Sequence, residues 1–396
     1  MCIPKKKERL DNDSFNRPKG DASPFSNKQN GTSTAAAMLN QLRNGGSEKE
    51  SIQKPESGDV KNTEDVKSSF KDKNNRQIIL QKVSTWVNRV LDTGVPKLII
   101  EFRQLARWRP ENMTAKAFME NRPLNRYTDV PCQDARRVIL KWPGIDNDYI
   151  HANYVATPSK DHHFICTQGP LQTTLQAFWA MVIQEKSEYV LMLCNTVECD
   201  KNKCEQYWPH EVGDSMVFGE DNEGKIVVTN LEASPMSEED YFVRVCKLKL
   251  DYKDSGKDVS TNILHFHWEN WPDRGVPATK LTAINLLAKV RNSTGPIIVH
   301  CSAGIGRTGT IVAISYVTEK MQAGEDCLAM NDLLKEIRTQ RIGSIQNEYQ
   351  YLYVHRVLLA YFLEKYRSRF EHILEGGGEE KYQQWCADYK KATGCD

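Results

Sequence analysis

Apolar residues recur with a helical period from about residue 76 to Gly94, which predicts an amphipathic helix at the start of a folded domain. Further segments with helical spacing are expected at 98–108, 281–291, 308–321, 330–339 and 348–367. Strands are predicted where short segments are continuously apolar or alternate, at 189–193, 241–250, 263–268 and 297–300. Because strands and helices are interspersed, the predicted fold class is α/β, with a mixed β-sheet flanked by helices on both faces.

The first 75 residues lack this periodicity and are dominated by Lys, Asn, Ser, Asp, Gly and Gln. A segment with so few apolar side chains buries too little surface to fold, so we expect a disordered N-terminal tail over 1–75. The folded domain is expected to span 76–370. Residues 371–396 are expected to form a short extension, in which a helix after a triple-glycine stretch docks through Tyr382 and Trp385.

Charge and cysteine content limit where the protein acts. The 53 basic and 52 acidic residues give a formal net charge of +1, which offers no general attraction to nucleic acid or to a membrane surface. No apolar run reaches the ~18 residues of a membrane span, and no signal-peptide core begins the chain. The 11 cysteines follow no disulfide framework. We therefore expect a cytoplasmic protein, with the nucleus as an open alternative; Cys2 is a weak candidate for lipidation.

One loop carries the candidate chemistry. An apolar strand ends at His300, the small-residue segment 301–307 follows, and a helix-compatible stretch starts at Thr308. Backbone N–H groups at such a helix N-terminus converge on one point and favour an anion there. The glycines of the loop allow close approach of a ligand, and Arg307 offers two donors to phosphate oxygens. The loop is therefore predicted to bind phosphate.

The same electrostatic field would lower the pKa of the Cys301 thiol and make it a nucleophile. Two other interpretations compete. A cysteine after an apolar strand is often a small buried hydrophobe, but the glycines and Arg307 argue against that here. A protease dyad with His300 is excluded, because neighbouring residues on a strand point to opposite faces.

This segment, a His-Cys pair followed by five residues and Arg-Thr-Gly, resembles the signature loop of protein tyrosine phosphatases. Other segments resemble further motifs of that family, at Asn125–Asp129, Glu198–Pro209, Trp271–Pro277 and Arg341–Tyr351, with scaffold blocks at 148–153, 167–170 and 178–179. The resemblance covers about residues 76–366. It implies a twisted α/β phosphatase domain that hydrolyses phosphotyrosine in proteins, as in cellular signalling, through a phosphocysteine intermediate.

The resemblance also implies residue roles. Cys301 would be the nucleophile, Asp273 the general acid and base, Arg307 the phosphate ligand and Gln346 the residue that positions water. Tyr127 would form the wall of a pocket too deep for phosphoserine, and Asp129 would hold the substrate backbone. Further substrate contacts are expected from Ser302, Ala303, Gly304, Ile305, Gly306 and Gln350. Supporting roles are expected for His300, Thr308, Glu198 beside Arg307, Lys203 beside Asp273, and Trp271 as a loop anchor.

Several positions depart from the usual residues of the family: Leu124, Thr128, His151, Arg274 and Asn347. These departures concern sequence preference around the phosphotyrosine. No cofactor or metal is implied, since Cys199 and Cys204 lack the further ligands of a zinc site. The expected partners are phosphotyrosine proteins, and the N-terminal tail is a candidate for binding others. The alternative function is a catalytically weak phosphotyrosine-binding or scaffolding protein.

Overall fold

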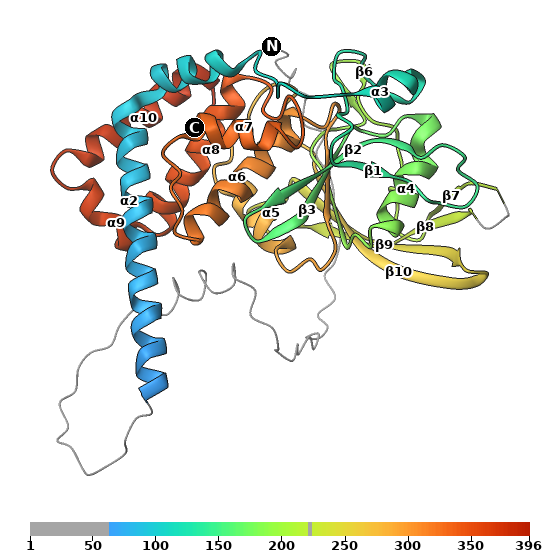
Figure 1. Cartoon of the computed structure of the whole chain (residues 1–396), viewed down its shortest axis with the longest axis horizontal. Helices are drawn as coiled ribbons and strands as arrows, with labels where there is room; N and C mark the ends of the chain where they lie inside the picture. Colours follow the sequence, from blue (N-terminus) through green and yellow to red (C-terminus); the bar gives the residue numbers. More distant parts are fainter. Residues whose placement is uncertain (1–62, 221–223) are drawn as a thin grey trace, which may run out of the picture.

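The computed structural model describes residues 63–220 and 224–396 (Figure 1). Within these residues, nine strands form one sheet in the order β1-β2-β3-β11-β4-β10-β9-β8-β7, and β5 pairs with β6 separately. The neighbours from β3 to β10 are parallel and the outer pairs are antiparallel, which confirms the predicted mixed sheet. The strands are β1 (Arg137–Ile139), β2 (Tyr149–Thr157), β3 (Lys160–Thr167), β4 (Tyr189–Met192), β5 (Val197–Glu198), β6 (Lys201–Asn202), β7 (Ser215–Phe218), β8 (Ile226–Pro235), β9 (Val243–Asp254), β10 (Lys257–Trp268) and β11 (Ile297–His300).

The central strand β11 positions the candidate loop. All four of its residues are buried, because β11 lies between β3 and β4, with Ile298 opposite Ile165 and Val190. The three strands are parallel, so their carboxyl ends meet at one edge of the sheet. Ligands of α/β proteins bind at such an edge. The candidate loop starts there, directly after His300.

Helices flank the sheet, as predicted (Figure 1). Helix α6 (Gly306–Gln322) is buried over most of its length and contacts β2, β3, β11 and the helices α5 (Thr282–Val290), α7 (Met330–Arg338) and α8 (Glu348–Ala360). Helix α4 (Leu175–Gln184) contacts β8. The remaining short elements are α3 (Lys116–Glu120) and the 3-10 turns η1 (Arg122–Leu124) and η2 (Gln172–Thr174). The N-terminus of α6 thus lies at the same sheet edge as the end of β11.

Helix α2 (Thr63–Leu105) opens the described chain and differs from the expected domain boundary. Its backbone leaves helical geometry at Gly94 (φ 68, ψ 162), two residues before Pro96, which confirms the predicted division into two helices. Residues 63–75 were expected in the disordered tail, but they are helical and continue into the first helix of the expected domain. The rest of the expected tail, with Cys2, lies outside the described residues.

The C-terminal region extends the helical layer. The helix expected over 348–367 is interrupted: α8 ends at Ala360, and a π-helical turn, η3 (Tyr361–Lys365), leads into α9 (Arg367–Leu374). Helix α10 (Gly378–Thr393) packs against α2, α8 and α9 (Figure 1), and Tyr382 and Trp385 are buried as expected. In the described part of the chain, no helix combines the length and apolar character needed to cross a bilayer.

Candidate active site

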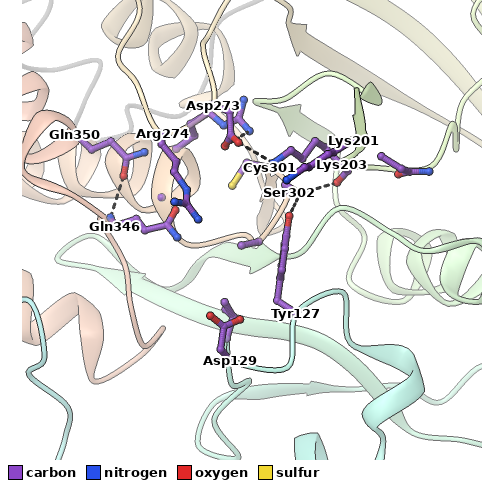
Figure 2. A pocket seen from close by; sticks show the side chains of 15 residues that line it. Tyr127, Asp129, Lys201, Lys203, Asp273, Arg274, Cys301, Ser302, Gln346 and Gln350 are labelled. Carbon is purple, nitrogen blue, oxygen red and sulfur yellow. Dashed lines mark hydrogen bonds and ion pairs between the residues drawn. The ribbon is translucent and has the colours of Figure 1, made fainter. Parts of the chain in front are cut away.

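A pocket of about 280 Å³ opens above the loop that joins β11 to α6 (Figure 2). It brings together residues that are far apart in sequence. Its walls come from the loop after η1, the β5–β6 hairpin, the segment after β10, the loop itself and the start of α8. The lining residues are Tyr127, Asp129, Val130, Lys201, Asn202, Lys203, Asp273, Arg274, Cys301, Ser302, Ala303, Gly306, Arg307, Gln346 and Gln350. Ten of the residues expected to act in catalysis or substrate binding therefore share one cavity.

The backbone of the loop curls tightly because two glycines leave space that a side chain would fill. Gly304 has φ +68, and a Cβ there would meet the carbonyl of Thr167 at the end of β3. A Cβ on Gly306 would come within 2.9 Å of the Gln350 amide. The loop is thereby packed against β3 on one side and against the start of α8 on the other.

Cys301 lies at the base of the pocket, where Figure 2 shows its sulfur below Asp273. Burial alone would raise the pKa of the thiol. The charge of Arg307 and hydrogen bonds from Thr308 and the Gly304 amide outweigh burial, so the pKa lies below its ordinary value. The Gly304 N–H donates to Sγ over 3.3 Å. The site therefore stabilises a thiolate, which is the nucleophilic form of cysteine.

Arg307 is held by a two-pronged ion pair with Glu198. The two guanidinium nitrogens donate to the two carboxylate oxygens over 2.6 and 2.8 Å, and Nη1 also donates to the Trp271 carbonyl over 3.0 Å. Both charged side chains are nearly inaccessible to solvent, with 3% and 8% exposed. Burial acts to lower the pKa of Arg307, but its partners, led by Glu198, raise it above its ordinary value. The guanidinium is thus charged and fixed in orientation.

Asp273 faces the pocket from the loop that follows β10. Lys203 Nζ donates to its Oδ2 over 2.7 Å, and Arg307 Nη2 lies 3.6 Å from its Oδ1. Burial would raise the pKa of the Asp273 carboxyl, but the hydrogen bond from Lys203 and the charges of Arg307, Lys203 and Arg274 lower it below its ordinary value. The expected contacts of Lys203 with Asp273 and of Glu198 with Arg307 are both present.

Tyr127 stands along one wall of the pocket, and its hydroxyl points to Ser302 (Figure 2). The two hydroxyls form a hydrogen bond of 2.8 Å, in which Tyr127 donates, because Ser302 Oγ itself donates to the Lys203 carbonyl over 2.9 Å. The ring is therefore held upright beside the cavity. Asp129 lines the pocket near Tyr127.

Two glutamines close the opposite side. The backbone N–H of Gln346 donates to Gln350 Oε1 over 2.9 Å, and Gln350 is buried. The side chain of Gln346 is exposed and lines the pocket. Its loop is attached to the phosphate-binding loop, since Ile345 N–H donates to the Ile305 carbonyl over 3.0 Å.

The other expected residues lie behind the cavity. Trp271 is buried, and its indole N–H donates to the Gly275 carbonyl over 3.2 Å. His300 is buried beside Tyr207, and burial lowers the pKa of its ring to about 3. Gly304 and Ile305 were expected to contact substrate, but neither lines the pocket, and the Ile305 side chain faces Gly343. Their main-chain groups form hydrogen bonds instead: the Gly304 N–H donates to Cys301 Sγ, and the Ile305 carbonyl accepts from the Ile345 N–H.

Comparisons with known proteins agree with this geometry. The family model described as protein-tyrosine phosphatase matches residues 121–360, which is more than half of the chain. The chain belongs to the protein-tyrosine phosphatase family. Mouse tyrosine-protein phosphatase non-receptor type 2 is 40% identical over 236 residues, which are 58% of this chain and 55% of that relative. Human receptor-type tyrosine-protein phosphatase zeta is 32% identical over 257 residues, 62% of this chain and 11% of that relative.

Solved structures of the family share the fold. The catalytic domain of human protein tyrosine phosphatase non-receptor type 18 superposes with a TM-score of 0.60 at 27% identity, and the match covers 71% of this chain and 99% of that one. Of the two curated relatives, the chain spans about half of the length of the mouse non-receptor type 2 phosphatase and about a tenth of the human receptor-type zeta phosphatase. Residues 121–360, which the family model matches, include every residue that lines the pocket.

Two arginines upstream of Gln346, Arg338 and Arg341, lie in the interior of the phosphatase domain. Arg341 is fully buried and donates to the carbonyls of Gly304 and Ala303 over 3.1 and 3.3 Å and to Asn153 Oδ1 over 2.8 Å. Burial and the charge of Arg341 lower the pKa of His151 to about 3, so the neutral ring accepts from Arg341 over 3.1 Å. Arg341 therefore holds the phosphate-binding loop from below.

Arg338 is also buried, and its guanidinium donates to the carbonyls of Ser344, Ile345 and Leu105. Burial lowers its pKa to about 10. Lys201, Asn202 and Val130, which no sequence pattern singles out, also line the pocket. No sequence signal separates a buried arginine from a surface one when its partners are main-chain carbonyls. Among the described residues, no cluster of His, Cys, Asp or Glu could hold a metal ion.

Proposed function

We propose that the protein hydrolyses phosphotyrosine in proteins through a phosphocysteine intermediate. The observation that carries this proposal is one pocket that holds a thiol of lowered pKa beside a fixed guanidinium, with a carboxyl group on the facing loop. Nucleophile, phosphate ligand and proton donor are the groups that phosphoryl transfer from an aryl ester requires.

In the first step, the Cys301 thiolate attacks phosphorus while the bond from phosphorus to the tyrosine oxygen breaks. Asp273 gives its proton to the departing phenolate, and Arg307 and the loop amides bind the phosphoryl oxygens. The Asp273 carboxyl must be protonated in this complex. A phosphate dianion in the pocket supplies negative charge that raises the pKa of Asp273 and so favours the protonated form.

In the second step, a water positioned by Gln346 attacks phosphorus and the sulfur–phosphorus bond breaks. The Asp273 carboxylate takes the proton from this water, and phosphate leaves the regenerated thiolate. The upright ring of Tyr127 supports selection of the long phosphotyrosine side chain, because a phosphoserine would not reach Cys301. Asp129, at the rim, would accept from the substrate backbone.

The second candidate is a protein that binds phosphotyrosine without efficient turnover. Its support is the set of phosphate-binding groups, which would hold a ligand even without chemistry. The complete catalytic set, with Cys301, Asp273, Arg307 and Gln346 in one cavity, favours the hydrolase. The need for a reduced thiol supports an intracellular, cytoplasmic location with phosphotyrosine proteins as partners.

Turnover of a phosphotyrosine peptide tests the proposal. Wild type should release phosphate, Cys301→Ser should release none while retaining peptide binding, and Asp273→Ala should lower kcat by roughly 10²–10⁴-fold. Cys386→Ser, which changes a partly buried thiol of α10 outside the pocket, is the matched control and should keep full activity. Peptide binding by wild type without phosphate release would favour the binding protein, and full activity of Cys301→Ser would refute the mechanism.

A further inference from the structure

Asn347 connects the two loops that carry Asp273 and Gln346. Its Oδ1 accepts from the backbone N–H of Gln350 over 3.0 Å and caps the N-terminus of α8. Its Nδ2 donates over 2.8 Å to the main-chain carbonyl of Arg274, 73 residues away in sequence. One side-chain amide thus uses both of its polar atoms, one for each loop.

The residue at the other end of this contact has an unfavourable backbone. Arg274 follows Asp273 directly and has φ 56, in the left-handed region that residues other than glycine rarely adopt. The adjacent turn is closed by the Gly275 N–H, which donates to the Pro272 carbonyl over 3.1 Å. A hydrogen bond to the Arg274 carbonyl stabilises the peptide plane in the orientation that this backbone requires.

The same orientation sets the place of Asp273. With the loop held in this way, the Asp273 carboxylate is 2.7 Å from Lys203 and 3.6 Å from Arg307, over the pocket. Without the Asn347 contact, the described residues give the Arg274 carbonyl no other protein donor. Relaxation of Arg274 toward ordinary backbone angles would move Asp273 first, because the two share a peptide bond.

We propose that Asn347 is a positioning residue for the general-acid step: its amide nitrogen holds the Arg274 carbonyl and thereby keeps Asp273 over the phosphate-binding loop. The inference rests on the proposed function. The donor is a side-chain amide and the acceptor a main-chain carbonyl, so the contact depends on the residue at position 347 and not on the side chain at position 274. It also ties the acid loop to the neighbour of Gln346, the residue proposed to position water.

The test separates the two functions of the Asn347 amide. Asn347→Ser and Asn347→Asp both keep an oxygen that caps α8, but neither has a nitrogen to donate to Arg274. Both variants should melt close to wild type. If a serine and an aspartate behave alike, the added charge of the aspartate is not the cause of any effect.

Two aryl phosphates report on the acid step. Phenyl phosphate has a poor leaving group that needs the proton from Asp273, whereas p-nitrophenyl phosphate has a good one. We expect kcat/KM for phenyl phosphate to fall about three- to tenfold in both variants, the scale of one lost hydrogen bond, with a clearly smaller fall for p-nitrophenyl phosphate. In an Asp273→Asn background, the same substitutions should cause no further fall with phenyl phosphate.

Three results would overturn the inference: no fall with phenyl phosphate, an equal fall with both substrates, or an undiminished fall in the Asp273→Asn background. The last two would assign Asn347 a structural role that does not act through the acid. Failure of the wild type to hydrolyse either aryl phosphate would instead overturn the proposed function, and this inference with it. Activity in the wild type therefore distinguishes failure of the function from failure of the positioning role.

Discussion

The ion pair between Glu198 and Arg307 offers the sharpest energetic prediction. In Glu198→Gln, the buried guanidinium keeps the Trp271 carbonyl but loses its carboxylate partner. Loss of one member of a buried pair costs about 3–5 kcal/mol of folding free energy. We expect the lower end, about 3 kcal/mol, because the Cys301 thiolate and the Asp273 carboxylate still face the guanidinium. For a domain of about 300 residues, with an unfolding entropy of about 2.1 cal/mol/K per residue, that corresponds to a fall in Tm of roughly 5 °C.

Activity should fall as well, because Arg307 would no longer be held in one orientation. Loss of a positioned donor to a transition state typically costs about 10²–10³-fold in rate, so kcat/KM on a phosphotyrosine peptide should drop by roughly 10²-fold. The measurements are a thermal unfolding curve and steady-state kinetics at one pH. Glu205→Gln is the matched control: it removes a carboxylate of the same segment that accepts from Asn202 near the surface.

If Glu198→Gln matched Glu205→Gln in both Tm and kcat/KM, the reasoning would be refuted. A fall in Tm with unchanged kcat/KM would show that the pair stabilises the fold but does not orient Arg307. A fall in kcat/KM without a fall in Tm would show the opposite. Only a fall in both Tm and kcat/KM agrees with a buried ion pair that stabilises the fold and also orients Arg307.

Three further predictions follow from the pocket. Burial acts to raise the pKa of Asp273, and the hydrogen bond and charge of Lys203 act to lower it. Lys203→Met should therefore raise this pKa, keep the acid protonated to higher pH and move the basic limb of the kcat–pH profile to higher pH. A shift of that limb to lower pH would contradict this. Tyr127→Ala should reduce the preference for phosphotyrosine over phosphoserine peptides, measured as a ratio of kcat/KM, and an unchanged ratio would remove Tyr127 as the depth-setting wall. Peroxide should inactivate the enzyme reversibly at Cys301, with protection by bound phosphate; mass spectrometry that found another cysteine oxidised first would oppose the lowered thiol pKa.

The sequence predicted the candidate site well where its chemistry is contiguous or matches a family motif. The loop from Cys301 to Arg307 follows an apolar strand and precedes a helix, and this local order alone suggests a phosphate site. The contact of Glu198 with Arg307 came from the family resemblance, since residues so distant in sequence have no local pattern that pairs them.

Other features depend on tertiary contacts that no pattern records. Arg338 and Arg341 are charged and lie among polar neighbours, yet both are buried, because main-chain carbonyls converge on them. The contact from Asn347 to the Arg274 carbonyl joins a side chain to a main-chain group, so the identity of residue 274 does not reveal it. Helix α2 starts at Thr63 although residues 63–75 are mostly polar, since polar composition alone does not prevent a helix from extending.

Detection of the phosphocysteine intermediate tests the central claim most directly. A phosphotyrosine peptide is mixed with Gln346→Ala, in which hydrolysis of the intermediate should be slow, and the reaction is quenched in acid within milliseconds to seconds. Mass spectrometry of the digested protein should locate one phosphoryl group on Cys301, with wild type showing less and Cys301→Ser none. A phosphoryl group on another residue, or release of phosphate from Gln346→Ala with no phosphoenzyme at any time, would contradict the account.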